Sequence, residues 1–413
     1  MDEPEWLPVF LQSIENQHYR NFSVEVCVNQ PDAWWKDPSR SAICQNNAES
    51  LSLLNSVSGF PLEVIDRSSS GSGWTGKRHG VGWARKTVMD QISRKAEPAD
   101  IILSLDADTL FSENYFESVA ETVANFPDAT ALTVPYYHRL PEDQEAARAI
   151  LRYEIYMRYY FLNLWRIRSP YAFTALGSAM AIPVWAYRKV GGMTPKLSGE
   201  DFYFLQKLRK SGKLICWNSE KVFPAARFSS RVFFGTGPAM IRGAEGNWDS
   251  YPIYAASLFD EIGESCILFP EMYKQTVDTE VTRFLRELTG EQDPFDSLRT
   301  NSREVHQFVR ACHEKFDGLR ILQYLKKRHQ EERDNDEELS TNDSYGTDGE
   351  RLLEWLRFFF PSDTRYAKDE GRKTKDEGRK KLSFSLSSLN VLDQIRNFLA
   401  REEDRIRREN PLF

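Results

Sequence analysis

Two aspartates close an apolar run in the sequence "DIILSLDADTL" (100–110). Neighbouring carboxylates at the edge of a core repel each other and lose hydration, so a positive partner is expected opposite them. At positions i and i+2 of an extended segment, Asp106 and Asp108 project to the same side, with Ala107 turned away. Such a pair of oxygen donors suits Mg2+ or Mn2+, with water and phosphate oxygens completing the shell. The alternative is that one Asp caps a helix or stabilises a turn.

A Gly/Ser loop precedes this pair in "RSSSGSGWTGKRHGVGWARK" (67–86). Its backbone N–H groups, together with Lys77, Arg78 and Arg85, could present positive charge to a diphosphate where a helix begins. The loop lacks the spacing of a P-loop and of a Rossmann fingerprint. A mobile surface loop is the alternative interpretation.

A second acidic pair stands in "LSGEDFYFLQKL" (197–208). Glu200 and Asp201 lie at a predicted helix start, where the helix dipole favours an ionised carboxylate, and Gly199 allows a ligand to approach closely. A carboxylate there could act as a general base toward an acceptor hydroxyl. The acidic first turn of an ordinary helix is an equally good explanation of this segment taken alone.

Alternating strands and helices must position these residues. The apolar periodicity predicts helices at 5–17, 47–56, 80–95 and 112–125, and strands at 22–29, 61–66, 101–105 and 129–137. This alternation predicts an α/β fold with a mixed, mostly parallel sheet flanked by helices. Ligands collect at the carboxyl ends of such strands, which is where Asp106 and Asp108 are expected.

The middle of the chain continues with a long helix at 142–168, an extended segment at 173–182 and a helix at 199–213 that Gly212 closes. Residues 227–250 are rich in Gly and Arg and are predicted to form a loop that could cover a site.

The composition changes beyond about residue 270, and four segments are expected. They are a catalytic domain (1–270), a helical extension (271–330), an acidic linker expected to be disordered (331–350), and a charged helical tail (351–413) that contains a KDEGRK duplication. The last helix, 384–408, should pack on the protein, on a partner or on a second copy through one apolar face, formed by Leu386, Leu389, Leu392, Ile395, Leu399 and Ile406.

Charge and cysteine content limit the classes of function. A formal net charge of −7 and a pI near 5.6 argue against a general nucleic-acid binder. The five cysteines are scattered and form no CxxC pair, which fits a reducing compartment without a zinc site. Neither a membrane-spanning run nor a signal peptide is evident, so we expect a cytoplasmic protein, with peripheral contact at the inner membrane face left open.

Four stretches in order resemble the GT-A glycosyltransferases of family 2. They are "EPEWLPVFLQSIENQHYRNFSVEVCVNQ", "GVGWARK", "DIILSLDADTLFSENYFESV" and "GSAMAIPVWAYRKVGGMTPKLSGEDFYFLQKLRKSG". The resemblance covers roughly residues 1–225. The DxD, GG and ED elements share the family's order and spacing, which is more specific than any one of them.

The resemblance implies a donor site for a UDP- or GDP-linked sugar. Asp106 and Asp108 match the aspartates that hold a divalent cation, Mn2+ or Mg2+, with the donor's diphosphate and ribose. Asn29 matches a position that lines the nucleotide base, and Arg85 matches an arginine near the diphosphate.

The resemblance also implies a hexosyltransferase-type reaction with a carbohydrate or lipid-linked carbohydrate acceptor, as in polysaccharide synthesis. Asp201 matches the catalytic base of inverting members, and Glu200 helps to hold the acceptor. Arg227 and Arg231, in "FPAARFSSRVFFGTG", replace the family's His or QxxRW element. They are candidates for contacts with phosphate or with an anionic acceptor, and surface salt bridges are the alternative.

Two further departures keep alternatives open. The family begins with an apolar strand that is not present before "MDEPEW", so we expect the natural start to lie upstream or the sequence to have been shortened. The part beyond about 270 matches no family element. A retaining GT-A enzyme and a non-catalytic nucleotide-sugar or carbohydrate-binding scaffold therefore remain as alternatives.

Overall fold

The computed structural model describes residues 2–76, 79–196, 198–229, 235–335, 344–361 and 382–412. The chain divides into two compact units. The first contains Met1–Ile150, Phe173–Gly246 and Arg401–Phe413, and the second contains Leu151–Ala172 and Asn247–Ala400. The predicted domain boundaries near 270, 330 and 350 remain predictions.

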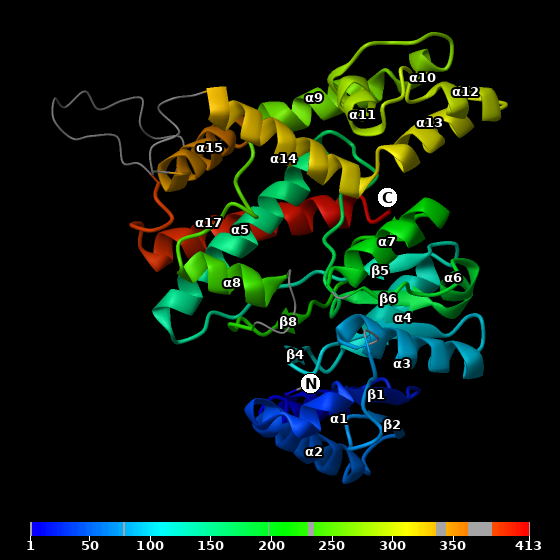
Figure 1. Cartoon of the computed structure of the whole chain (residues 1–413), viewed down its shortest axis with the longest axis vertical. Helices are drawn as coiled ribbons and strands as arrows, with labels where there is room; N and C mark the ends of the chain where they lie inside the picture. Colours follow the sequence, from blue (N-terminus) through cyan, green and yellow to red (C-terminus); the bar gives the residue numbers. More distant parts are fainter. Residues whose placement is uncertain are drawn as a thin grey trace. The chain divides into compact units, whose positions relative to one another are not determined.

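A four-stranded sheet forms the centre of the first unit (Figure 1). Its order is β3 (Ile101–Ser104), β6 (Met180–Pro183), β5 (Ala131–Thr133) and β7 (Leu214–Ile215). Strand β6 is antiparallel to both neighbours, whereas β5 and β7 are parallel. The side chains of β5, β6 and β7 are all buried, as expected for strands covered on both faces. The predicted mixed α/β fold of GT-A type is confirmed.

Two smaller ladders complete the strands described in this unit. Strands β1 (Val24–Asn29) and β2 (Leu62–Arg67) are parallel, and their register pairs Asn29 with Arg67. Strands β4 (Thr109–Leu110) and β8 (Phe223–Pro224) are antiparallel. The parallel ladder ends at one level, so the segments that follow β1 and β2 leave the sheet at the same edge.

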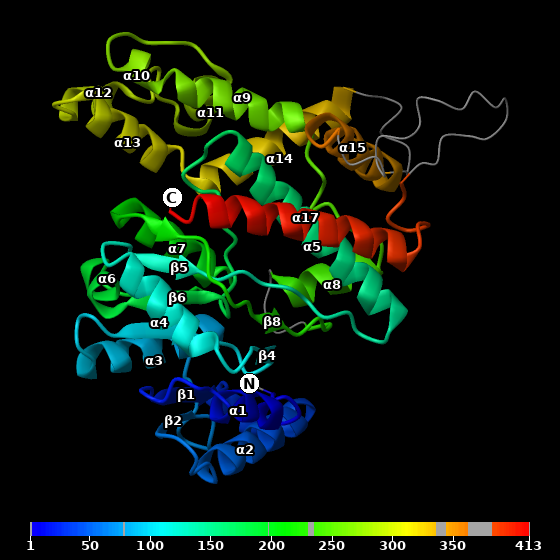
Figure 2. The ribbon, with the colours of Figure 1, turned by 180° about the vertical axis from the view of Figure 1, so that it is seen from behind.

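Helices surround these strands. They are α1 (Leu7–Glu15), α2 (Ser41–Asn55), α3 (Val81–Lys95), α4 (Tyr115–Asn125), α6 (Val184–Lys189), α7 (Glu200–Ser211) and α8 (Thr236–Ala244), with short 3-10 turns at Asp32–Lys36 and Pro38–Arg40. Seen from behind, α4 crosses the central sheet (Figure 2). Helix α3 packs on both β1 and β3, so it joins the two sheets.

Several helices form for reasons visible in their residues. In α1 the buried side chains of Leu7, Phe10 and Ile14 recur at helical spacing. Helix α7 ends before Gly212, as predicted. The prediction of a loop throughout 227–250 is wrong, because α8 occupies its centre and buries Ala239 and Met240. The loop prediction rested on Gly and Arg content alone, which gives no sign of this short apolar face.

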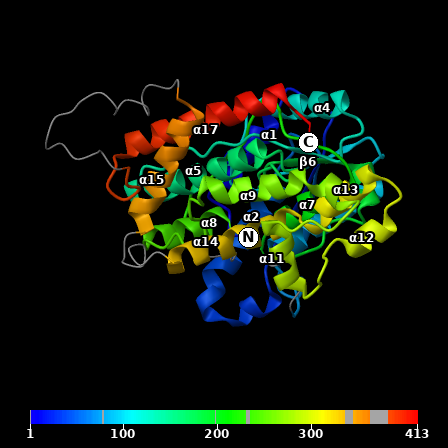
Figure 3. The same ribbon diagram turned by 90° about the horizontal axis from the view of Figure 1, so that it is seen from above.

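The second unit is helical in its described residues, and Figure 3 shows its helices from above. It takes most of α5 (Gln144–Arg166) and α17 (Leu389–Glu409), and it contains α9 (Ala256–Ile267), α10 (Phe269–Met272), α11 (Glu280–Thr289), α12 (Asp296–Asn301), α13 (Val305–Lys315), α14 (Gly318–Asn335) and α15 (Ser344–Phe359). Helix α9 packs on α11 and α14, and α10 packs on α13. No helix among the described residues is long and apolar enough to span a bilayer.

Helix α17 buries three of the six residues of its predicted apolar face. Leu392, Ile395 and Leu399 are buried, whereas Leu386 precedes the helix and is 87% exposed. Arg396 is buried on the same helix and lies 3.6 Å from Glu154 of α5. The expected face therefore packs on the protein itself, and an association of this helix with a partner remains a prediction.

The last residues of the chain extend the central sheet. Leu412 forms an antiparallel bridge with Ile215 of β7, and the Cys216 amide donates to the Pro411 carbonyl at 2.9 Å. Arg407 is 1% exposed, pairs with the buried Glu403 and donates to the Cys216 carbonyl at 3.1 Å. The chain end is thus part of the first unit.

Replacing Arg407 with Ala should destabilise the protein by about 3–5 kcal/mol, because Glu403 would keep a buried charge without this partner. Arg405→Ala is the matched control, since Arg405 is 53% exposed and its ion pairs should contribute less than about 1 kcal/mol. Denaturant unfolding of both variants measures the difference. Equal stabilities would contradict a structural role for the Arg407 pair.

Candidate active site

The two aspartates of the DxD element lie in a turn that follows β3. The Thr109 amide donates to the Asp106 carbonyl at 3.0 Å, which closes the turn before β4 begins. The predicted extended geometry is therefore wrong, because this backbone hydrogen bond bends the chain at Ala107. The two carboxylates consequently reach different arginines.

Arg85 of α3 binds the first of these carboxylates. Its Nη2 lies 2.5 Å from Asp106 Oδ1, and its Nη1 pairs with Glu200 Oε1 at the start of α7. The Arg85 side chain is only 8% exposed. Burial by itself lowers the pKa of Arg85, but Asp106 and Glu200 outweigh it and raise the pKa above the usual value. Arg85 thus stays charged and joins three elements.

Two glycines make room for this arrangement. A Cβ at Gly177 would lie 2.5 Å from Arg85 Nη2, so only glycine lets the guanidinium rest on the backbone there. The Ser104 hydroxyl fixes that segment by donating to the Gly177 carbonyl at 2.7 Å. A Cβ at Gly82 would lie 2.4 Å from the Lys196 carbonyl, so α3 approaches the segment before α7 equally closely.

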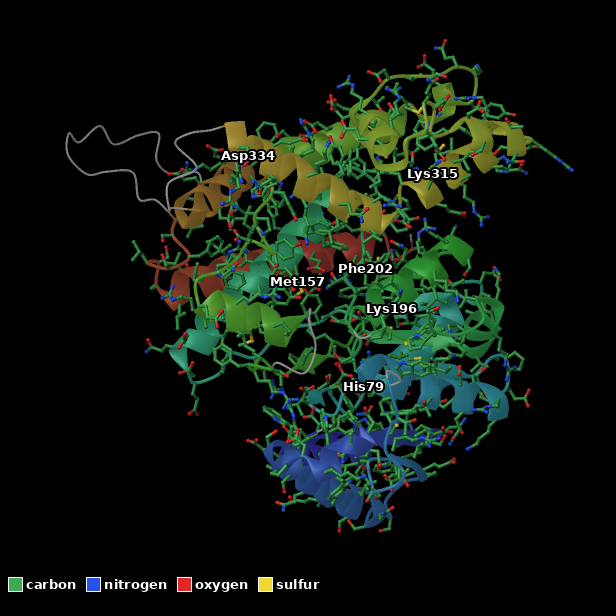
Figure 4. The ribbon with its side chains drawn as sticks, viewed as in Figure 1. His79, Met157, Lys196, Phe202, Lys315 and Asp334 are labelled. Atoms are coloured by element: carbon green, nitrogen blue, oxygen red, sulfur yellow. The ribbon has the colours of Figure 1, made fainter. Side chains whose placement is uncertain are left out.

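Asp201 stands beside Glu200 in the first turn of α7. Burial and, next, the neighbouring Glu200 raise the pKa of Asp201, Arg85 lowers it, and the net pKa is about 7. The Phe202 amide donates to Asp201 Oδ1 at 2.8 Å. Figure 4 labels Lys196 and Phe202, which flank this acidic pair in the sequence. The carboxyl is poised to exchange a proton near neutral pH.

Arg227 binds the second DxD carboxylate. Its Nε and Nη2 lie 3.0 Å and 2.6 Å from Asp108 Oδ2, and Nη2 also lies 2.6 Å from Glu3 Oε2. The guanidinium carbon is 5.5 Å from the centroid of the Trp6 ring. The pairing of Thr109 with Pro224 brings the segment after β8 beside the DxD turn. Arg231 lies outside the described residues, as do Lys77 and Arg78.

Asn29 ends β1 and is 6% exposed. Its Oδ1 atom is buried and accepts no hydrogen bond from the described residues. The Trp74 indole N–H is also buried and donates no hydrogen bond to them. The Arg67 guanidinium carbon lies 5.2 Å from the Trp74 ring centroid. The Trp74 amide donates to the Gln30 carbonyl at 2.9 Å, so the Gly/Ser loop lies against the end of β1.

Sequence reasoning missed Glu3, Gly177 and Arg67. Gly177 lies within the quoted stretch that begins "GSAMAI", and its close approach to Arg85 becomes visible only in three dimensions. Glu3 is 224 positions from Arg227, and its local sequence carries no signal of that contact. Arg67 could have been found from its place directly after the predicted strand 61–66.

The candidate site offers carboxylate oxygens, the kind of ligand that Mg2+ and Mn2+ prefer. The ion-paired cluster contains the carboxylates of Glu3, Asp106, Asp108, Glu200 and Asp201 and the guanidinium groups of Arg85 and Arg227. Fully ionised, it carries three more negative than positive charges. No group of three or more His, Cys, Asp or Glu side chains in the described part of the chain is arranged to hold a metal ion. Asp106 and Asp108 would therefore need oxygen atoms of the donor to complete a coordination shell.

Comparison with known families assigns this region. The model described as glycosyl transferase family group 2 matches residues 101–295. The chain carries a family 2 glycosyltransferase domain of GT-A type. The match begins at β3 and includes the DxD turn, α7 and Arg227. A search of curated proteins found no match. The glycosyltransferase domain indicates an enzyme that uses a nucleotide-sugar donor.

Gly177→Ala should displace the Arg85 guanidinium and cost about 1–3 kcal/mol of stability, because the added methyl group overlaps the guanidinium atoms that form both ion pairs. Denaturant unfolding measures the loss. Gly59→Ala is the control, since its Cβ would meet only the exposed Glu15 side chain. A Gly177→Ala protein as stable as the control would contradict the packing of the Arg85 guanidinium against Gly177.

Proposed function

We propose that this glycosyltransferase is a metal-dependent, inverting hexosyltransferase. It moves a sugar from a UDP- or GDP-linked donor to a hydroxyl of a carbohydrate or lipid-linked carbohydrate acceptor. One observation carries the proposal: Arg85 pairs with Asp106 of the DxD turn and with Glu200, the neighbour of Asp201. The carboxylates assigned to the donor and the carboxylate assigned to proton transfer thus belong to one cluster.

Four residues form the proposed donor site. Asp106 and Asp108 would hold Mg2+ or Mn2+, which when bound stabilises negative charge on the departing nucleoside diphosphate. Arg85 lies against Asp106, and its fixed guanidinium contributes positive charge where the diphosphate binds. The buried Oδ1 of Asn29 supports a hydrogen bond with the nucleotide base, because it has no partner in the described protein.

Asp201 is the proposed general base. Its carboxylate takes the proton from the acceptor hydroxyl, whose oxygen forms a bond to the anomeric carbon. The bond from that carbon to the diphosphate oxygen breaks with its electron pair, and the nucleoside diphosphate leaves. A single displacement of this kind inverts the anomeric configuration. The raised pKa supports the role, because a base is most effective when its pKa lies near the working pH.

Glu200 supports this arrangement through Arg85. Its side chain is 5% exposed and pairs with the guanidinium, so it fixes the cation that faces Asp106. A contact between Glu200 and the acceptor stays a prediction, as does a phosphate contact of Arg231. Cytoplasmic location, peripheral contact with the inner membrane face and a part in polysaccharide synthesis complete the proposal.

Asp201→Asn should keep donor binding and lower sugar transfer by a factor on the order of 10² to 10⁴, because the amide cannot accept the acceptor's proton.

Asp108→Ala should abolish metal-dependent donor binding. Calorimetric donor binding and nucleotide release from a panel of UDP- and GDP-sugars, each with Mn2+ or Mg2+, measure the two effects separately. Full transfer by Asp201→Asn would rule out the base assignment.

Stereochemistry provides an independent check on the mechanism. Proton NMR of the product's anomeric centre should show inversion relative to the donor sugar. Retention would favour the retaining GT-A alternative, and donor binding without any transfer would favour a non-catalytic scaffold.

Transfer activity should fall as the pH drops below about 7, because Asp201 is protonated below its raised pKa and cannot act as a base. Above that pH the carboxylate is ionised and the rate should level off. A profile of kcat/KM from about pH 5 to 9 measures this limb. A profile that is flat between pH 5 and 8 would show that no base with such a pKa controls the reaction.

A further inference from the structure

The two DxD carboxylates are held by arginines of different character. Arg85 is 8% exposed, rests on Gly177 and has a second carboxylate partner, Glu200. Arg227 is 23% exposed and follows β8, whose ladder with β4 is only two residue pairs long. Breaking the Arg85 pairs would leave Arg85 and Glu200 as buried charges, whereas Arg227 is more exposed than Arg85 and can keep one carboxylate partner when it leaves the other.

A second acceptor is already in place for Arg227. Its Nη2 contacts both Glu3 carboxylate oxygens at 2.6–2.7 Å while it also contacts Asp108. The Trp6 ring lies 5.5 Å from the same guanidinium. If Asp108 turned away, Arg227 would therefore keep a charged partner and an aromatic one, both from the amino-terminal segment.

We propose that Arg227 is an exchangeable counter-ion for Asp108. When the donor site fills, a divalent cation replaces the Arg227 guanidinium at Asp108, and the guanidinium stays paired with Glu3. This proposal rests on the donor site assigned above. In the free enzyme Arg227 neutralises Asp108 and competes with the cation. Arg85 stays on Asp106 throughout, so one aspartate is permanently oriented and the other is released by ligand.

The consequence is weak cation binding before the donor arrives. A cation must break two hydrogen bonds from the guanidinium to Asp108, and charged hydrogen bonds of this kind are among the stronger ones in proteins. Glu3 has the opposite effect, because it attracts Arg227 away from Asp108. Variants at the two positions should therefore shift cation affinity in opposite directions.

Mn2+ binding to the full chain without donor tests this, by electron paramagnetic resonance of free Mn2+. Arg227→Lys should bind Mn2+ about tenfold more tightly than the unmodified protein, because a lysine keeps the charge but loses the guanidinium fork. Glu3→Gln should bind more weakly. Arg20→Lys, an exposed change elsewhere in the first unit, is the control and should match the unmodified protein.

A different result is expected if Arg227 affects cation binding only through its positive charge and is not displaced from Asp108. In that case Arg227→Lys would bind Mn2+ as the unmodified protein does, and the proposal would be overturned. Absence of Mn2+ binding in every variant would also overturn it, whereas donor turnover by the unmodified protein would still support the transferase function. The displacement of Arg227 and the transferase function can therefore be disproved independently of each other.

Tryptophan fluorescence provides a second readout that needs no variant of Arg227. Mg2+ added with the donor nucleotide should change the emission of Trp6 as the guanidinium moves relative to its ring, and Trp6→Phe should remove that part of the change. An identical Mg2+-dependent change in Trp6→Phe would contradict the movement.

Discussion

The ion pairs of Arg85 are the contacts on which the site depends. Its guanidinium brings together the turn after β3 and the start of α7, and it compensates the charge of Glu200, which would be costly to bury alone. The requirement extends to the backbone, because Gly177 and Gly82 leave the space that α3 and the guanidinium occupy. Arg85 is therefore as much a structural residue as a candidate ligand for the donor diphosphate.

The environment of Asp201 follows from the same cluster. Burial and the neighbouring charge of Glu200 raise the pKa of its carboxyl to about 7. The carboxylate that pairs directly with Arg85 in this turn is that of Glu200. One acidic pair thus supplies two different groups. Glu200 pairs with the Arg85 guanidinium, and Asp201 is the group proposed for proton transfer.

Buried charge pairs recur beyond the site. Arg158 and Glu154 pair at 2.6 Å inside the second unit, and Arg407 and Glu403 pair on the part of α17 that belongs to the first. Such pairs contribute little when intact but are costly to break, so they favour one packing of each helix over alternatives. This explains why a tail that looks highly charged in sequence buries Arg396 and Arg407.

The sequence alone was sufficient to predict the α/β class, most helices and strands of residues 1–213, and the family, because hydrophobic periodicity and the DxD and ED spacing are local properties. It could not predict the helix at Thr236–Ala244 or the turn at Asp106–Asp108. It also did not show which cation meets which carboxylate. The contacts of Arg85 with Glu200 and of Arg227 with Glu3 join residues 115 and 224 positions apart, and only the tertiary structure decides such pairs, since a charge's partner depends on what the fold brings within hydrogen-bonding distance.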